Sequence, residues 1–153
     1  MNIAALVDNL SVSQSSFYMI KNFNKLAEDA QHDACCFYAN LAVPPTSAMF
    51  TMMHLYYSQN FHGTLISDNI EMANVSLATY NNSDKYLYLW DIEWLRGSLS
   101  YEGVLNVLRN PFLKIIARSE SHARLIENFC NKKPCGIVED WNIEQLKGLI
   151  ESQ

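Results

Sequence analysis

The sequence predicts an α/β fold: a single doubly wound Rossmann-like domain, with a mostly parallel sheet of about six strands and helices on both faces. Short apolar runs alternate with stretches of helical periodicity along the chain. Polar or acidic residues follow the apolar runs, as at the ends of parallel strands. The 153 residues, 49% of them hydrophobic, can also bury one core without metal or disulfide support.

Six short runs are predicted as strands. The first, IAALV, is continuously apolar, which is typical of a strand covered on both faces. The six runs occupy residues 3–7, 35–39, 63–67, 86–90, 113–117 and 136–138.

A helix is predicted after each strand, because apolar residues recur there at helical spacing and polar residues suited to N-caps precede them. Pro44 and Pro45 form a firm break, after which Thr46 or Ser47 can cap a helix reaching Tyr56. Three further helices are predicted at about residues 13–30, 70–79 and 101–109, and another begins after its cap at Ser119. A C-terminal helix is predicted at residues 142–153. It packs on the rest of the chain, so that residues 1–153 form a single domain.

The ends of the predicted strands carry the candidate site. The residues at these ends are Asp8, Asn40, Asp68, Asp91, Ser119 and Asp140. In open parallel sheets ligands bind outside the carboxyl ends of the strands. We therefore expect these side chains to ring one edge of the sheet.

Composition excludes several classes of function. The net charge of −5, with 11 Lys and Arg that do not cluster, argues against a general nucleic-acid binder. No apolar run approaches the ~20 residues of a transmembrane helix, and the opening MNIAALVDNL resembles a buried strand more than a signal peptide. We expect a cytoplasmic protein without membrane contact. Its four cysteines fit no zinc pattern and are predicted to be reduced, with Cys35 and Cys36 on opposite faces.

The turn after the first strand contains no glycine, so neither a dinucleotide fingerprint nor a phosphate-binding loop is present, and no cofactor is expected. The next helix could hold an anion at Ser13, Gln14 and Ser15, although a plain helix cap at Ser13 explains the same residues.

The segment WDIEW, residues 90–94, is the most distinctive in the chain. Carboxylates accept hydrogen bonds from hydroxyl groups and indoles stack on apolar sugar faces, so Asp91 and Glu93 could grip a sugar between Trp90 and Trp94. Asp91 is also a candidate general base if burial raises its pKa. The alternative is that both indoles are core or interface aromatics and Asp91 caps a turn.

The histidines show no metal-binding pair. His122 could contact an anion together with Arg118, or it could be an ordinary surface residue. A weaker hypothesis is a small-molecule hydrolase that uses Asp91 or His62, and it is supported only by the types of these residues.

Four segments share their order of elements with a known enzyme family. NIAALVDNLSVSQSSFYMI, KYLYLWDIEWL, LKIIARSESHARLIENF and CGIVEDWNIEQL resemble the N-terminal, acceptor-side domain of GT-B glycosyltransferases. The chain is also similar to small glycosyltransferase-like proteins of tailed phages, including those of marine cyanobacteria. This resemblance implies a viral protein in the host cytoplasm that binds a sugar or nucleotide-sugar.

The chain departs from that family in three ways. The glycine-rich loop is missing, Trp90 replaces the histidine that often acts as base while Asp91 is kept, and the donor-binding second domain has no counterpart. The resemblance therefore implies an oligomer or a partner chain. The strand-end rule, the motifs above and this resemblance together give the expected ligand-binding residues: Asp8, Asn9, Ser13, Asp68, Glu93, Arg118, Ser119, His122 and Asp140. The alternative is a non-catalytic accessory or structural protein that keeps half of the enzyme fold.

Overall fold

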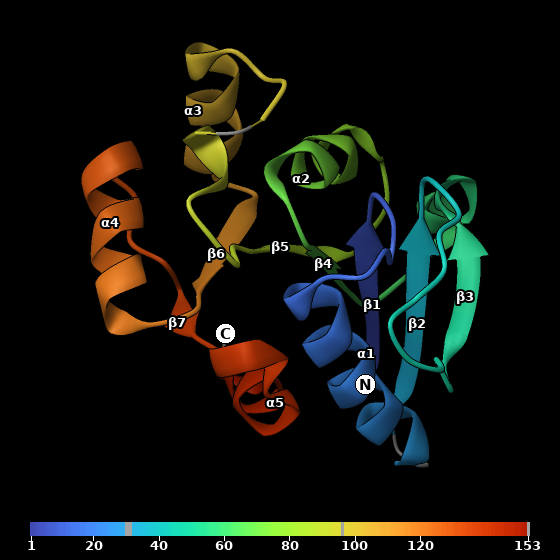
Figure 1. Ribbon diagram of the computed structural model, residues 1–153. Coiled ribbons are helices and arrows are strands. Elements are labelled where there is room, and N and C mark those ends of the chain that lie inside the picture. Colours follow the sequence, from blue (N-terminus) through green and yellow to red (C-terminus); the bar gives the residue numbers. More distant parts are fainter. Residues whose placement is uncertain (30–31, 96, 153) are drawn as a thin grey trace.

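The computed structural model describes residues 1–29, 32–95 and 97–152. Its strands form one sheet in the order β3-β2-β1-β4-β5-β6-β7, and every pair of neighbouring strands is parallel (Figure 1). The predicted α/β, doubly wound class is confirmed. The chain moves outward from β1 in one direction and from β4 in the other, which places the topological switch point between these two strands.

All six predicted runs are strands, within one or two residues at most ends. The strands are β1 (Asn2–Val7), β2 (Asp33–Tyr38), β3 (Thr51–His54), β4 (Thr64–Ser67), β5 (Asp84–Tyr88), β6 (Leu113–Ala117) and β7 (Gly136–Ile137). The central strands β1 and β4 are almost wholly buried, in keeping with their continuous apolar runs.

The seventh strand, β3, lies where the sequence predicted a helix, and that prediction is wrong. Met52 packs against one core cluster and Met53 against another, as expected of alternating side chains in a strand. The spacing of these methionines also suits a helix, but the segment instead pairs with β2. A short 3-10 helix, η1 (Leu55–Asn60), follows, with His54 as its N-cap.

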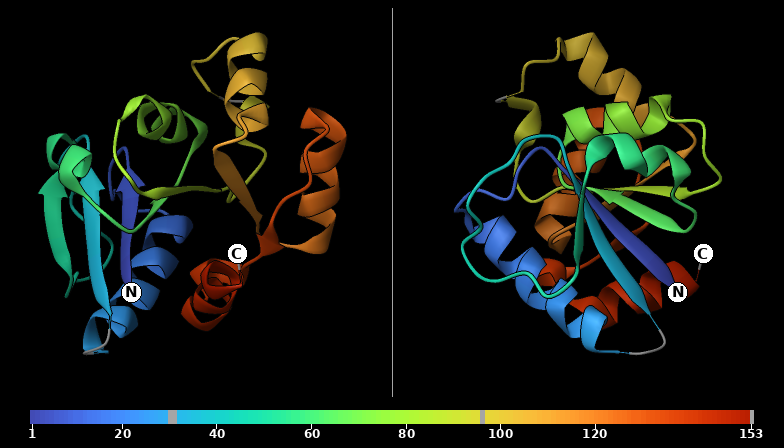
Figure 2. Two further views of the ribbon diagram at one scale, coloured as in Figure 1. Left: turned by 180° about the vertical axis from the view of Figure 1, so that it is seen from behind. Right: turned by 90° about the vertical axis from the view of Figure 1, so that its right-hand side faces the viewer.

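The helices cover both faces of the sheet (Figures 1 and 2). One face carries α1 (Gln14–Glu28) and α5 (Ile143–Glu151), which contact each other. The other carries α2 (Ile70–Ala78), α3 (Tyr101–Arg109) and α4 (Glu120–Cys130). This division follows from right-handed crossovers that run in opposite directions from the centre of the sheet.

The predicted caps are confirmed at three helices. The side chains of Ser13, Ser119 and Asn142 each accept a hydrogen bond from a backbone N–H in the first turn of α1, α4 and α5. The predicted end of the first helix at Ala30 falls outside the described residues.

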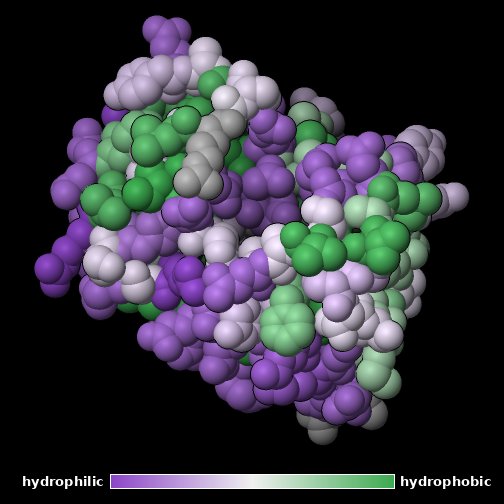
Figure 3. Space-filling model, viewed as in Figure 1, coloured by the Kyte–Doolittle hydropathy of each residue, from purple (hydrophilic) through white to green (hydrophobic). Residues whose placement is uncertain are grey.

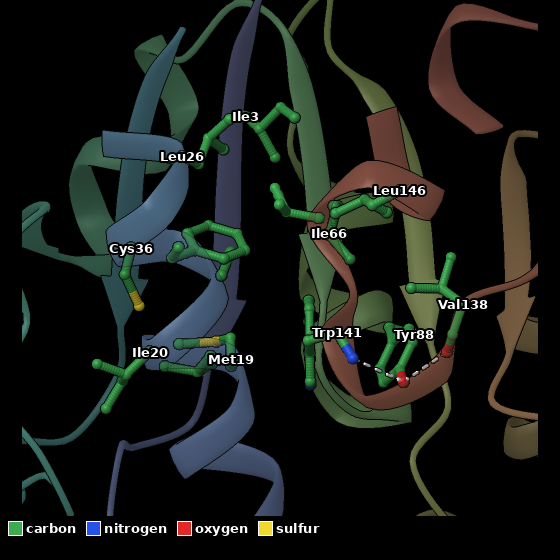
Figure 4. Close-up of a cluster of buried hydrophobic side chains, with 14 of the residues drawn as sticks. Ile3, Met19, Ile20, Leu26, Cys36, Ile66, Tyr88, Val138, Trp141 and Leu146 are labelled. Atoms are coloured by element: carbon green, nitrogen blue, oxygen red, sulfur yellow. Dashed lines mark hydrogen bonds between the residues drawn. The ribbon is translucent and has the colours of Figure 1, made fainter. Parts of the chain in front are cut away.

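The largest core cluster lies under α1 and α5 and centres on Trp141, which is fully buried (Figure 4). The Tyr88 hydroxyl donates to the Val138 carbonyl at 2.8 Å and accepts from the Trp141 N–H at 3.3 Å. These bonds join β5 to the chain between β7 and α5. Two short 3-10 turns, η2 (Glu93–Leu95) and η3 (Glu139–Trp141), complete the described elements.

The cysteines behave as predicted. All four are free thiols, and Cys35 and Cys36 pack into clusters on opposite faces of the sheet. Among the described helices, none is both long and apolar enough to cross a bilayer.

Candidate functional site

The predicted ring of strand-end residues is confirmed as an arrangement in space. The residues after β1, β2, β4, β5, β6 and β7 are Asp8, Asn40, Asp68, Asp91, Ser119 and Asp140, and the strands are all parallel. The edge divides into two parts. We call Asp8, Asn9, Asn40, Asp68, Asn69 and Glu93 the acidic half, and Trp90, Arg118, Ser119, His122 and Asp140 the paired half.

The acidic half is built on two Asp–Asn dipeptides at the switch point. Asn9 and Asn40 each donate an amide hydrogen bond to the Asp8 carboxylate, at 2.6 and 2.8 Å. Asn69 donates in the same way to Asp68, at 2.8 Å. Since β1 and β4 are neighbours, the two carboxyls face each other across the point where α1 and α2 leave on opposite faces.

Two carboxyls of the acidic half are unusually basic. Burial, and to a smaller extent the charge of Asp8, raises the pKa of Asp68 to about 8. Burial and then the charge of Asp68 raise the pKa of Glu93 to about 8, against a lowering by the Ile70 N–H. At neutral pH both groups are therefore mostly protonated. The Glu93 Oε2 atom is buried and has no hydrogen-bond partner within the described part of the chain.

A pocket of about 210 Å³ opens beside this half of the edge. Asn69, Asp91 and Glu93 supply its polar wall, whereas Leu99 and Val104 supply its apolar wall. Glu71 also lines the pocket, and its carboxylate accepts hydrogen bonds from the N–H and hydroxyl of Ser98. These bonds lower the pKa of Glu71, so this carboxylate stays ionised while Glu93 is protonated.

The paired half is closed by contacts within the protein. Arg118 donates from Nε and Nη2 to Asp140 Oδ1, at 3.0 and 2.8 Å. Its guanidinium also lies 3.8 Å from the centre of a Trp90 ring, and Tyr18 stacks on the same indole at 6.0 Å. Ligand binding here would have to displace contacts that already exist.

The two indoles follow the packing interpretation more closely than the sugar-stacking one. Trp90 packs against the largest core cluster. Trp94 stacks on Phe129 at 4.7 Å and belongs to the cluster under α3 and α4.

The predicted anion contact of His122 with Arg118 also finds little support. His122 is buried, and its burial lowers the pKa of the imidazole, which is therefore neutral at pH 7. Its Nδ1 accepts the Arg118 N–H at 3.4 Å. The Ser119 and Ser13 hydroxyls both serve as helix caps, which supports the simpler interpretation at each position.

Asp91 is exposed, so the burial on which its predicted role as a base depended is absent. Glu93, two residues later, is partly buried, and its Oε2 atom is fully buried. The structure also gives no support to a hydrolase site that contains both His62 and Asp91. His62 precedes β4 and Asp91 follows β5, and because these strands are parallel the two residues lie at opposite ends of the strands.

Sequence reasoning missed Asn69 and Glu71, although the repeated Asp–Asn after two strands was a visible signal. Across residues 1–29, 32–95 and 97–152, no three His, Cys, Asp or Glu side chains converge closely enough to hold a metal ion. Comparison of the chain with family models, with curated proteins and with solved structures finds no match.

Proposed function

We propose that this chain is a glycosyltransferase-like domain, equivalent to the acceptor half of a GT-B enzyme, and that it binds a sugar at the acidic half of its sheet edge. The observation that carries the proposal is the pair of Asp–Asn dipeptides beside a pocket that contains a protonated Glu93. The resemblance of the strand-end segments to that family agrees with it.

The chemistry of the acidic half suits hydroxyl groups. A sugar hydroxyl both donates and accepts hydrogen bonds, so it needs donors and acceptors at close range. Carboxylates such as Asp8 accept hydrogen bonds. The Asn69 amide keeps one N–H beyond the bond that it donates to Asp68, while its oxygen caps α2. A protonated Glu93 can donate from Oε2, which has no partner among the described groups. The apolar wall of Leu99 and Val104 would cover the C–H face of a sugar ring.

The same chemistry favours a neutral sugar over a nucleotide-sugar. Carboxylates repel a diphosphate, and no basic side chain is among the described residues that line the pocket. Arg118, on the paired half, is already engaged by Asp140. The nucleotide-sugar donor would then be held by another domain or a partner chain.

Glu93 rather than Asp91 would act as the base in a transfer reaction. A base works best when its pKa lies near the working pH, and Glu93, at about 8, meets that condition inside the pocket. In its ionised form, Glu93 would accept the proton of the acceptor hydroxyl. The hydroxyl oxygen would then bond to the donor's anomeric carbon while the bond from that carbon to the nucleotide diphosphate breaks, and the diphosphate would stay with the domain or partner chain that holds the donor.

The test is a titration of the protein with neutral monosaccharides and disaccharides and, separately, with UDP- and GDP-sugars. We expect millimolar or tighter binding of a neutral sugar, with NMR shifts at Asn69, Asp91 and Glu93. Glu93→Ala should weaken binding at least about tenfold. Glu127→Ala, which removes an exposed glutamate on α4, is the matched control. No binding of any sugar at millimolar concentration would refute the proposal.

A second candidate is a non-catalytic accessory or structural protein. It is favoured by residues 34–67, which contain no Asp, Glu, Lys or Arg although such residues make up 18% of the chain. If sugars fail to bind while the protein associates through this segment, the second candidate replaces the first.

A further inference from the structure

The far edge of the sheet is formed by β3, an open strand without charge. Within the described part of the chain, β3 pairs with β2 alone. Its outer side presents unpaired backbone N–H and C=O groups, for which natural sheets provide protection by lysine, proline or a bulge. The strand TMMH has none of the charged or proline residues that provide it.

The surroundings of β3 are apolar and equally uncharged. Figure 3 shows apolar side chains gathered on the right-hand part of this view, where Figure 1 places β2, β3 and the connection between them. Five large apolar side chains from the uncharged segment are exposed: Leu41, Val43, Met49, Tyr56 and Tyr57. Leu41 and Val43 are each more than 80% exposed, at 81% and 82%.

We propose that two copies of this chain associate through β3, antiparallel to each other, so that the two sheets become one. A two-fold interface brings the same surface of both copies together, so any charge there faces its own kind. Residues 34–67 avoid that repulsion because they hold no formal charge. Elsewhere each copy carries the whole net charge of −5, which opposes association through other faces.

The size of the contact decides which residues take part. A stable interface buries about 800 Å² on each partner, more than four strand residues supply. The exposed side chains on both sides of β3 must therefore contribute. In this arrangement the carboxyl edges of the two sheets point in opposite directions, so each copy keeps its own acidic half. The inference is thus independent of the proposed sugar site.

The test is sedimentation equilibrium of the full chain, with Thr51→Lys as the disrupting variant. Thr51 is exposed at the start of β3, and a lysine there places a charge in the apolar contact. We expect the dimer dissociation constant to rise at least about tenfold. Phe112→Lys, at an exposed position just before β6 and therefore far from β3 in the sheet, adds the same charge and should leave the constant unchanged.

Two further readouts separate this interface from others. Added salt should strengthen the dimer, because it screens the repulsion between two acidic copies and no ion pair is lost. Hydrogen exchange at residues 51–54 should slow as protein concentration rises, and should not slow in Thr51→Lys. A chain that stays monomeric at high concentration, or a dimer that Thr51→Lys leaves intact, would overturn the proposal.

Discussion

Both halves of the carboxyl edge are formed by residues that follow parallel strands, but their polar side chains differ in the partners that they have. In the paired half, Arg118 is satisfied by Asp140 and Trp90, and the chain there is held by the Tyr88 hydroxyl. In the acidic half, Asp68 and Glu93 are partly buried, burial raises the pKa of both, and Glu93 Oε2 has no partner among the described groups.

The difference indicates which half does chemistry and which half supports it. Each half contains a buried atom without a hydrogen-bond partner among the described groups, Glu93 Oε2 and His122 Nε2, but of these two residues only Glu93 lines the pocket. An unpartnered polar group costs stability, and beside a pocket it is available to a ligand. The paired half instead stores backbone strain, because Asp140 and Trp141 both have positive φ, at 45° and 59°. We interpret Arg118, Asp140, Tyr88 and Trp141 as the residues that hold the β7–α5 connection in place, and we call these four residues the lock. We interpret the acidic half as the binding surface.

Removing the indole of the lock should have the largest effect. Trp141 is fully buried against Phe23 and Tyr88, so Trp141→Ala leaves a large cavity and should cost about 3–5 kcal/mol of unfolding free energy. Urea unfolding measures it. Phe112→Ala, at an exposed position away from β3, should stay within about 0.5 kcal/mol. A loss below about 1 kcal/mol in Trp141→Ala would contradict the role of this lock.

The raised pKa values of the acidic half should make the free energy of unfolding depend on pH. A carboxyl whose pKa is about 8 in the folded state and near 4 when unfolded binds its proton more tightly in the fold. Its stabilising contribution is complete below pH 4 and is lost as the pH rises to 8. Unfolding free energy should therefore fall across this window.

Glu93→Gln keeps the shape of the protonated group and removes the titration. We expect the variant to match the unmodified protein near pH 4 and to exceed its stability at pH 8 by on the order of 3 kcal/mol. Thermal unfolding at several pH values measures this, with the exposed Glu127→Gln as control. A variant that is less stable at pH 8 would show that Glu93 is held as a carboxylate.

The hydroxyl of Tyr88 should contribute less than the indole it holds. Tyr88→Phe leaves the Val138 carbonyl without its bond in the core, which should cost about 1–2 kcal/mol. Tyr86→Phe is the matched comparison on the same strand, since its hydroxyl meets only the Lys114 ammonium at 3.3 Å. It should cost about 0.5 kcal/mol. Equal losses in both variants would remove the distinction between the lock and an ordinary buried tyrosine.

Much of this edge could be predicted because its signals are local. Each strand-end residue follows an apolar run, and the caps Ser119 and Asn142 stand next to the helices they begin. Strand β3 could not be predicted, because its methionines suit a helix and only the open side of β2 selects the extended form. The choice between Asp91 and Glu93 depends on burial, which η2 creates by turning the second carboxyl inward, and the sequence carries no sign of that turn.

The smallest effect should come from the charge of the Arg118–Asp140 pair. Both groups are about one-third or more exposed, so water screens their attraction. Asp140→Asn keeps an oxygen that accepts both Arg118 bonds and tolerates a positive φ, and should cost about 0.5 kcal/mol or less. Asp140→Ala loses the acceptor and keeps the strain, and should cost about 1–2 kcal/mol more. If Asn costs as much as Ala in urea unfolding, charge rather than geometry holds this half closed, and the paired half would then open at high salt.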